Sequence, residues 1–333
     1  MTIEQWPVPK FADIEAAAAR IKPWAIETPL IENADLNARI GGRVLLKPEM
    51  FQRTGSFKFR GACNRILQIP EADRKKGVVA FSSGNHAQGV AAVAALFGIP
   101  ATIVMPEDAP KAKIDGTKSY GAEIVTYDRR TGDREAIAAE IVSKRGATLV
   151  KPFDDPAIVA GQGTVGLELG RQAGNLGASP DAVFVPCGGG GLVSGTSLAL
   201  SQICPVARTV AVEPVGYDGM RRSREAGIRT SAPANEKSMA DSLMSPMPGA
   251  TPFALAKAHL GDAITVNDDD LARAVSYSFR RLKLVVEPGG AAGLAAVLRD
   301  AAQFRGRTIA VVLSGGNCDP ETTAACCERV PTP

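Results

Sequence analysis

The chain alternates short apolar runs with longer helical patterns, and no other feature limits its possible folds as strongly. Runs that are apolar throughout are typical of strands buried on both faces of a parallel sheet. We expect strands at Val44–Lys47, Val78–Ser82, Ala101–Met105, Glu123–Tyr127, Thr148–Val150, Ala182–Pro186, Thr209–Val212, Ala263–Val266 and Thr308–Leu313. We expect helices at Ile14–Ile21, Phe57–Leu67, Asn85–Phe97, Lys111–Tyr120, Arg134–Lys144, Ile158–Ala173, Leu192–Ile203, Leu271–Leu282 and Gly290–Ala302. The pattern predicts an α/β protein whose sheets are flanked by helices.

These strands are too many for one ordinary open sheet, so we expect two sheets in two domains. Residues 54–153 form a compact run of strand–helix units and are predicted to be a small mobile domain. Residues 1–53 and 154–333 are predicted to form a large domain. Gly227–Ala250 is rich in Ser, Pro, Ala and Met, which is typical of a loop or flap.

The charge pattern argues against a large anionic partner. The net charge of +3 is spread along 333 residues, so neither nucleic acid nor a membrane surface is expected. Ala87–Met105 carries no charge, but Gly98–Pro100 interrupts it, which favours a buried helix followed by a strand over a membrane span. Met1–Pro9 shows no signal peptide, and the six cysteines fit neither a zinc site nor a disulfide framework. We therefore expect a cytoplasmic, reduced protein.

A lysine stands at a predicted helix start. Ser56 is a good N-cap, which places Lys58 in the first turn of the helix that follows. A cation there opposes the helix dipole, so helix propensity does not explain it. The same field favours a neutral amine, as a nucleophilic lysine requires. For an isolated lysine, the alternative is an ordinary solvated side chain.

Small polar residues follow the strand at Val78. The loop Ser82-Ser83-Gly84-Asn85-His86 opens the next predicted helix, and free N–H groups at a helix start suit a carboxylate. Ordinary strand-to-helix turn chemistry is the alternative for this loop. His86 could equally cap its own helix without a catalytic role.

Two further loops are glycine-rich. Gly188–Gly191 joins a strand to a helix, and its backbone N–H groups suit a phosphate dianion. Ser314 follows the last strand, with glycines leaving space beside it. A competing interpretation is a dinucleotide-binding unit made by the glycine run and Glu213, but Ser194 stands where that fingerprint needs Gly or Ala. That interpretation also leaves the other loops unexplained.

Several segments together resemble one enzyme family. The chain is similar to serine/threonine dehydratases and serine racemases, which are fold type II, tryptophan-synthase-β-like enzymes dependent on pyridoxal 5′-phosphate. The resemblance covers nearly the whole chain and rests on Thr54–Arg60, Ser82–Val90, Asp154–Glu168, Gly188–Leu192, Glu287–Gly293 and Ser314–Asn317. It implies a two-domain fold in which each domain has a mostly parallel sheet flanked by helices, the large domain holding the cofactor.

The resemblance also implies roles for individual residues. Lys58 is expected to carry the cofactor as a Schiff base, and Phe57 to lie beside the ring. Gly188, Gly189, Gly190 and Gly191 are expected to hold the phosphate, Asn85 to bind the ring oxygen, and Ser314 to face the ring nitrogen. Substrate is expected at the loop formed by Ser82, Ser83, Gly84, Asn85 and His86.

The implied reaction is dehydration and deamination of L-threonine or L-serine to a 2-oxo acid and ammonia. Lys58 would remove the α-proton before the β-hydroxyl leaves. The alternatives within the family are serine or hydroxyaspartate racemisation and 3-hydroxyaspartate dehydration. Ser83 matches the second base of the racemases, yet dehydratases commonly carry the same residue.

Two departures concern the surroundings of the site. Ala240-Asp241-Ser242 replaces a common Ala-Asp-Gly, which is expected to bring a side chain near the ring. The family's divalent-cation site would begin at Glu213, but Gly219 stands where its next acid is expected, with Asp218 one place early. Metal binding at Glu213 is therefore in doubt. The family also implies a homo-oligomer, either a dimer or a tetramer.

Overall fold

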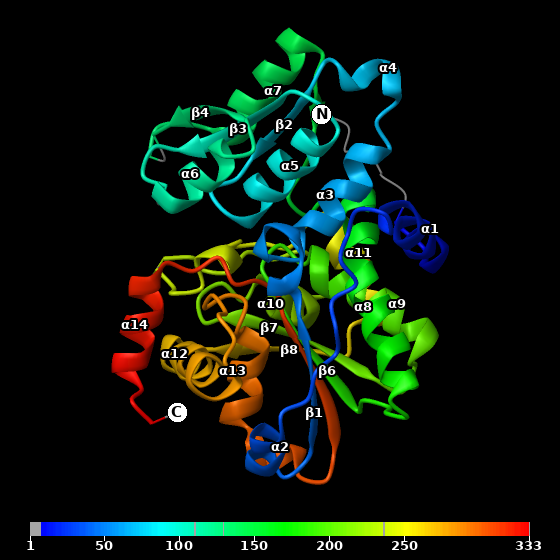
Figure 1. Ribbon diagram of the computed structural model, residues 1–333, viewed down its shortest axis with the longest axis vertical. Coiled ribbons are helices and arrows are strands. Elements are labelled where there is room, and N and C mark those ends of the chain that lie inside the picture. The colour runs from blue at the N-terminus through cyan, green and yellow to red at the C-terminus, as the bar shows by residue number, and fades with distance from the viewer. Residues whose placement is uncertain (1–7, 110, 129, 236, 333) are drawn as a thin grey trace.

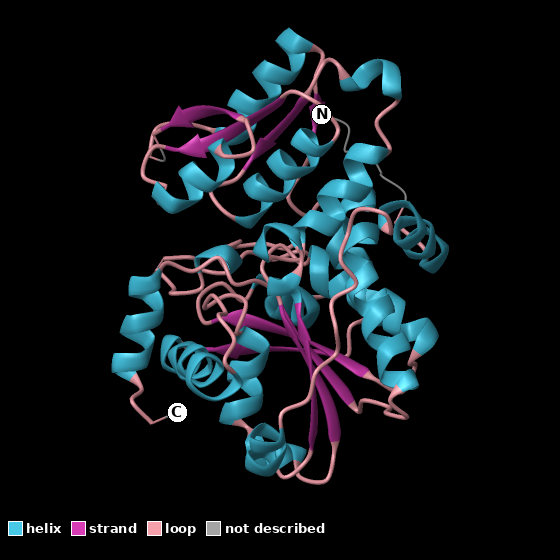
Figure 2. Cartoon of the chain, in the orientation of Figure 1, coloured by secondary structure: helices cyan, strands magenta, loops and turns pink. Residues whose placement is uncertain are grey.

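The computed structural model describes residues 8–109, 111–128, 130–235 and 237–332 (Figure 1). In this part of the chain the strands form two wholly parallel sheets, one of five strands and one of four. Helices flank both sheets (Figure 2). The expectation of an α/β protein with two helix-covered sheets is confirmed.

Most of the helices connect successive strands. In chain order they are α1 (Phe11–Ile21), α2 (Ala34–Ile40), α3 (Lys58–Leu67), α4 (Glu71–Arg74), α5 (Asn85–Leu96), α6 (Lys111–Lys118), α7 (Arg134–Arg145), α8 (Pro156–Asn175), α9 (Gly191–Ile203), α10 (Gly219–Ala226), α11 (Ala250–His259), α12 (Asp268–Tyr277), α13 (Ala292–Arg299) and α14 (Pro320–Arg329). Short 3-10 turns lie at η1 (Glu49–Phe51), η2 (Arg53–Gly55), η3 (Asp241–Leu243) and η5 (Ala301–Phe304), and a π-helical turn at η4 (Ser278–Leu282).

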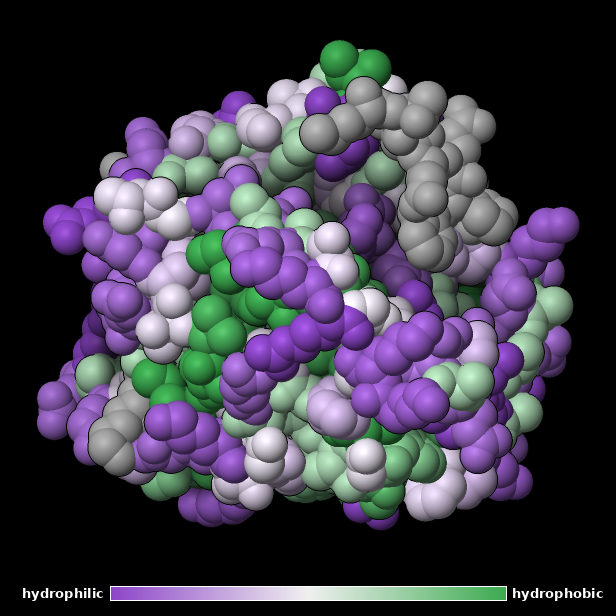
Figure 3. Space-filling model, turned by 90° about the horizontal axis from the view of Figure 1, so that it is seen from above, coloured by the Kyte–Doolittle hydropathy of each residue, from purple (hydrophilic) through white to green (hydrophobic). Residues whose placement is uncertain are grey.

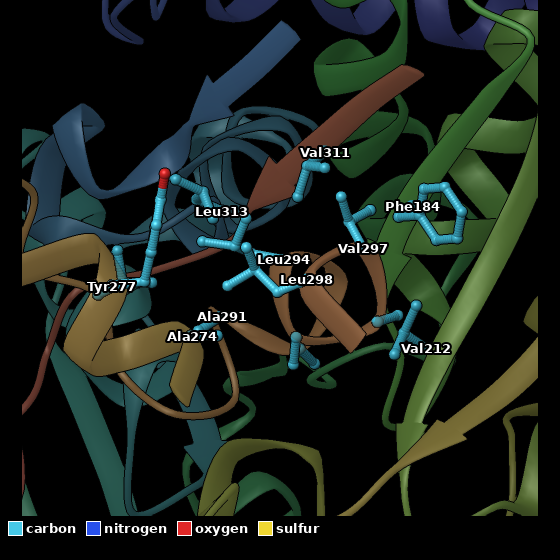
Figure 4. Packing of buried hydrophobic residues seen from close by; sticks show 14 of the residues in the cluster. Phe184, Val212, Ala274, Tyr277, Ala291, Leu294, Val297, Leu298, Val311 and Leu313 are labelled. Atoms are coloured by element: carbon cyan, nitrogen blue, oxygen red, sulfur yellow. The ribbon is translucent and has the colours of Figure 1, made fainter. Parts of the chain in front are cut away.

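The larger sheet is covered on both faces. Its strand order is β1 (Arg43–Pro48), β9 (Thr308–Leu313), β6 (Ala182–Pro186), β7 (Arg208–Pro214) and β8 (Asp262–Val266). Alternate residues of β9 enter different cores: Val311 and Leu313 pack with α13, whereas Val312 packs with α8 and α9. Figure 4 shows the first of these cores, with Leu294, Val297 and Leu298 packed against the strands. This two-sided burial explains why the strand sequences are apolar throughout.

The smaller sheet has the strand order β4 (Glu123–Tyr127), β3 (Ala101–Pro106), β2 (Val78–Phe81) and β5 (Thr148–Leu149). Val78 and Ala80 face a core shared with α3 and α5. Val79 and Phe81 face the opposite core, which contains Ala138 of α7. All four strands lie within residues 54–153, and the five strands of the other sheet lie outside that range. The expected boundaries of the two domains stay a prediction.

Local sequence sets several helix starts. Asp155 accepts hydrogen bonds from the backbone N–H groups of Ala157 and Ile158, and Pro156 is the first residue of α8. Asn267 and Asp270 form a reciprocal capping box at α12.

The remaining features concern loops and surface. In the described part of residues 227–249, η3 is the one helical turn, as expected for a loop. None of the described helices is long and apolar enough to cross a membrane. Seen from the small-sheet end, hydrophilic residues cover most of the surface, with apolar side chains showing between them (Figure 3).

Candidate active site

A cavity of about 210 Å³ collects loops from both sheets. Strands β6 and β9 are neighbours, so the loops that follow them lie side by side, and the loop after β2 reaches the same cavity. The residues predicted for cofactor and substrate all line it, namely Phe57, Lys58, Ser82, Ser83, Gly84, Asn85, His86, Gly188, Gly189, Gly190, Gly191 and Ser314. Of the predicted site residues, Glu213 does not line this cavity.

Lys58 is the first residue of α3, and its amine lies at the wall of the cavity. Its Nζ donates a hydrogen bond to the carbonyl oxygen of Pro152 at 2.8 Å and lies 5.2 Å from the centroid of the Phe57 ring. Desolvation lowers the pKa of this amine to about 8, against an opposing contribution from the Glu287 carboxylate. A sizeable fraction of the amine is therefore neutral near physiological pH, as a nucleophile or base requires.

The predicted cap of this helix is wrong. The N-cap is Phe57, which has helical backbone angles, and the hydroxyl of Ser56 is buried without a hydrogen-bond partner among the described residues. Ser56 instead pairs with Gly315 in an antiparallel bridge, and Phe57 N donates to Ser314 O at 3.2 Å. Tertiary pairing with the loop after β9 has overridden local capping, and it brings Lys58 next to Ser314.

The loop after β2 leaves the start of α5 open. No side chain caps this helix, because Gly84 occupies the N-cap position and its N–H donates to Ser82 Oγ at 3.2 Å. His86 does not cap the helix, since its Nε2 lies 2.9 Å from Val150 O. Burial lowers the pKa of His86 to about 3, with a further contribution from the Lys58 charge. The imidazole is therefore neutral, donates from Nε2 and leaves Nδ1 without a partner among the described residues.

The glycine loop is closely packed on its outer side. A Cβ atom on Gly188 would lie 3.0 Å from the backbone of Leu243, and one on Gly189 would enter the ring of Phe153. Gly190 has φ +91°, and a Cβ there would lie 2.7 Å from Met220 Cε. Its successor, Gly191, begins α9 without a side-chain cap. The loop therefore presents backbone N–H groups at a helix start, which suits an anion.

An amide network surrounds Asn85. Asn317 Nδ2 donates to Asn85 Oδ1 at 2.8 Å, and Asn85 Nδ2 donates to Glu287 Oε1 at 2.5 Å. Glu287 lines the cavity and is 2% exposed. It lies within one of the motifs that carry the family resemblance, but no role was expected for it, although a carboxylate inside a glycine-rich motif was a usable signal.

A charged outer wall of the cavity was not predicted. Lys113 of α6 and Asp241 of η3 line the cavity and form an ion pair between the two sheet systems. Arg134 of α7 also lines it, with its guanidinium 5.3 Å from the centroid of the Phe81 ring. Ser242 lines the same cavity as Ser314. The expectation that its side chain lies near the cofactor ring stays a prediction.

Glu213 has another structural role. Both of its carboxylate oxygens accept hydrogen bonds from backbone N–H groups at the start of α10, from Met220 at 2.8 Å and Arg221 at 2.9 Å. Asp218 pairs with Arg221 and Arg222. The described residues contain no group of three or more His, Cys, Asp or Glu side chains placed to hold a metal ion. A cation at Glu213 stays a prediction, and no step below depends on it.

The polar groups that line the cavity fit pyridoxal phosphate. A buried amine, a glycine loop at a helix start and unpartnered polar atoms on His86 and Glu287 line one cavity within the described part of the chain. A cofactor that carries both an aldehyde and a phosphate would use the first two features together.

Comparisons with known proteins agree with this fit. Residues 21–315 match the family model described as "Pyridoxal-phosphate dependent enzyme". The chain is 42% identical over 314 residues to the L-threo-3-hydroxyaspartate ammonia-lyase of Saccharomyces cerevisiae, covering 94% of each chain. It is 41% identical to the serine racemase of Schizosaccharomyces pombe, covering 95% of this chain and 97% of the racemase. The crystal structure of the T.th. threonine deaminase matches with TM-score 0.87 and 43% identity, over 93% of this chain and 99% of that one.

Proposed function

This chain belongs to the family of pyridoxal-phosphate dependent enzymes, and from that membership we propose that it is an ammonia-lyase acting on a small β-hydroxy amino acid. L-Threonine or L-serine would be converted to a 2-oxo acid and ammonia. The observation that carries the proposal is the position of Lys58, whose amine shares one cavity with an uncapped helix start and a glycine loop. The dinucleotide interpretation of that glycine loop has no support from the family match, which includes it.

In this proposal, different residues that line the cavity would bind different groups of the cofactor. Lys58 would hold it covalently, Gly188–Gly191 would hold its phosphate, Asn85 its ring oxygen and Ser314 its ring nitrogen. Phe57 would pack beside the ring. When bound, the cofactor supplies an electron sink for the pair left at the α-carbon.

The protein's own groups would then handle the protons. The Lys58 amine, with its pKa near 8, is matched to take the α-proton close to neutral pH. The backbone N–H groups at the open start of α5 would bind the substrate carboxylate. The His86 imidazole is neutral, so it adds no charge beside them. Loss of the β-hydroxyl as water, followed by hydrolysis, balances as one 2-oxo acid and one ammonia per amino acid.

A second candidate substrate is 3-hydroxyaspartate. Arg134 and Lys113 add two cationic side chains to the cavity wall, and a second substrate carboxylate would need such a partner. Lys113 is already paired with Asp241, which leaves Arg134 as the better partner. The S. cerevisiae relative carries this substrate in its name.

Racemisation is a second candidate reaction, because Ser83 lines the cavity with Lys58 and could return a proton. The ratio of D-serine to pyruvate formed from L-serine separates the two reactions. We expect pyruvate to predominate, and a ratio well above one would make the protein a racemase. Ser83→Ala should remove D-serine formation and leave ammonia release from L-threonine largely intact.

The function is tested with the purified, cofactor-loaded chain. Ammonia and 2-oxo acid would be measured with L-threonine, L-serine and L-threo-3-hydroxyaspartate, with Lys58→Ala as the inactive control. Preference for hydroxyaspartate that Arg134→Gln abolishes, with threonine turnover retained, would select the second substrate. Absence of ammonia from all three would overturn the lyase proposal.

A further inference from the structure

Glu287 is a buried acid that the proposed chemistry does not use. It precedes α13, is 2% exposed and lines the cavity. Its Oε1 accepts a hydrogen bond from Asn85 Nδ2 at 2.5 Å. Its Oε2 is buried and has no hydrogen-bond partner among the described residues. An unsatisfied buried carboxyl oxygen is costly, so its retention beside a ligand cavity calls for an explanation.

The orientation of the Asn85 amide follows from its neighbours. Asn317 Nδ2 donates to Thr54 O at 2.7 Å and to Asn85 Oδ1 at 2.8 Å. Because Asn317 is the donor, the Asn85 oxygen must face it, and the Asn85 nitrogen must face Glu287. One of the two Nδ2 hydrogens is thereby used by Glu287. The other is the single side-chain donor that Asn85 has left for a ligand.

The backbone leaves room for the Glu287 carboxyl and the Asn85 amide at Gly315. Glu287 N donates to Gly315 O at 3.1 Å, which fixes the carboxyl against the loop after β9. A Cβ atom on Gly315 would overlap Glu287 Oε1 and lie 3.3 Å from Asn85 Nδ2. The space for the carboxyl–amide pair therefore depends on a residue without a side chain.

The charged groups around Glu287 come from several elements. Burial is the largest influence and raises its pKa, as does Asp241, whereas Asn85, Lys113 and Lys58 lower it, leaving the pKa at about 7. Burial is the largest cause of the raised pKa of the Cys318 thiol, in the loop after β9, and the Glu287 charge adds to it. The carboxyl is therefore divided between its charged and neutral forms at physiological pH.

We propose that Glu287 is a positioning residue, which aims the free side-chain N–H of Asn85 at the bound cofactor and holds an exchangeable proton inside the cavity. The proposal rests on the assignment of Asn85 to the cofactor in the proposed function. In the neutral form, the proton resides on Oε2 and gives that oxygen a donor for the ligand. In the charged form, Oε1 accepts more strongly from Asn85.

Two variants separate the charge from the hydrogen bond. Glu287→Gln keeps an acceptor for Asn85 but removes the proton, so cofactor affinity should fall by less than about threefold. Glu287→Leu removes both, and the cofactor dissociation constant should rise roughly tenfold or more. Because Glu287 acts through Asn85, the double variant Glu287→Leu/Asn85→Ala should bind no more weakly than Asn85→Ala alone. Additive losses would contradict the positioning role.

The proton is followed by two spectroscopic readouts on the holoenzyme. Titration from acid to alkaline pH should change the cofactor's visible absorption with a midpoint near 7 in the parent protein, and Glu287→Gln should lack this transition. Infrared difference spectra should show a protonated carboxyl that disappears over the same range and is absent in Glu287→Gln. An unchanged midpoint in Glu287→Gln, or no carboxyl signal, would overturn the proposal. The ammonia assay is independent of both, so failure of the lyase function would be recognised separately.

Discussion

Lys58 is the first residue of α3, where the positive end of the helix dipole disfavours a charged amine. The pKa of this amine is lowered, but its largest cause is desolvation, and the Glu287 charge opposes it. Helix position predicts the direction of the shift. The burial that causes most of it, and the opposing carboxylate from more than two hundred positions further along the chain, are visible only in the fold.

The pH dependence of cofactor attachment tests this balance. Covalent attachment needs the neutral amine, so the rate at which the cofactor-free protein takes up pyridoxal phosphate should rise with pH and level off above about 8. An ordinary lysine would still be gaining rate well above that pH. Stopped-flow absorbance measures the rate. Glu287→Gln should move the midpoint to lower pH, because the neighbouring negative charge is gone.

At the scale of elements, the apolar runs predicted each of the described strands, because burial on both faces leaves an unambiguous pattern. Five of the described helices were not predicted. The signals for α14 were present, namely Asp319 followed by Pro320, and α2 has Asn33 at its start and Gly41 at its end. Helix α11 has Gly249 at its N-cap and no side-chain cap, so its start carries a weaker signal. The loops of the site could be predicted from their sequence motifs. The Lys113–Asp241 ion pair could not be predicted, because it forms only where the two sheets approach each other.

The glycine loop provides an element-scale prediction. Gly190→Ala should raise the dissociation constant of the cofactor roughly tenfold or more, since the new Cβ forces Met220 and the loop apart. Gly216→Ala is the matched control, because Gly216 has a similar φ of +85° with nothing within 4 Å of its Cβ position. Both variants should lose about 1–2 kcal/mol of stability from backbone strain. Isothermal titration of the cofactor separates them, and equal affinities would contradict the packing argument.

At the scale of the whole molecule, charged groups fix α3 to the larger sheet. Arg60 lies two residues after Lys58, and its guanidinium contacts Glu49 at 2.7 Å and Glu168 at 2.5 Å, while Lys47 contacts Glu168 at 2.7 Å. Arg60, Glu49 and Lys47 are fully buried. The two cations and two carboxylates of this cluster balance in charge. Their contacts hold α3, which carries the reactive amine, in a fixed position against β1 and α8.

Removing one member of this buried charge cluster should lower the stability of the protein. Arg60→Met leaves Glu49 buried without its guanidinium, so the free energy of unfolding should fall by about 3–5 kcal/mol. Arg43→Met is the control, because Arg43 contacts Glu32 at the same 2.7 Å but at the surface, and little change is expected. Urea denaturation measures both. Similar losses of unfolding free energy in the two variants would show that burial does not determine the contribution of these ion pairs to stability.

The ion pair across the cavity is the other molecule-scale contact. Asp241→Asn should raise the KM for the amino acid roughly fivefold with a smaller effect on kcat, because Lys113 no longer draws the two sheet systems together. Added salt should raise the KM of the parent protein and have less effect on the variant. Glu140→Gln removes an ion pair with Lys144 that is more exposed and lies away from the cavity, and it should change neither constant.

The position of β1 at the edge of its sheet has a consequence for biosynthesis. Among the described strands its ladder partner is β9, which begins about 260 residues after β1 ends. At roughly 5–20 residues per second, a ribosome needs on the order of tens of seconds to make that stretch. Throughout that interval Val44, Leu45 and Leu46, which are fully buried in the folded chain, lack the partner strand β9, whereas the four strands of the smaller sheet are already complete at Leu149. A chaperone that binds extended apolar segments would therefore find β1 the longest-lived target on the growing chain.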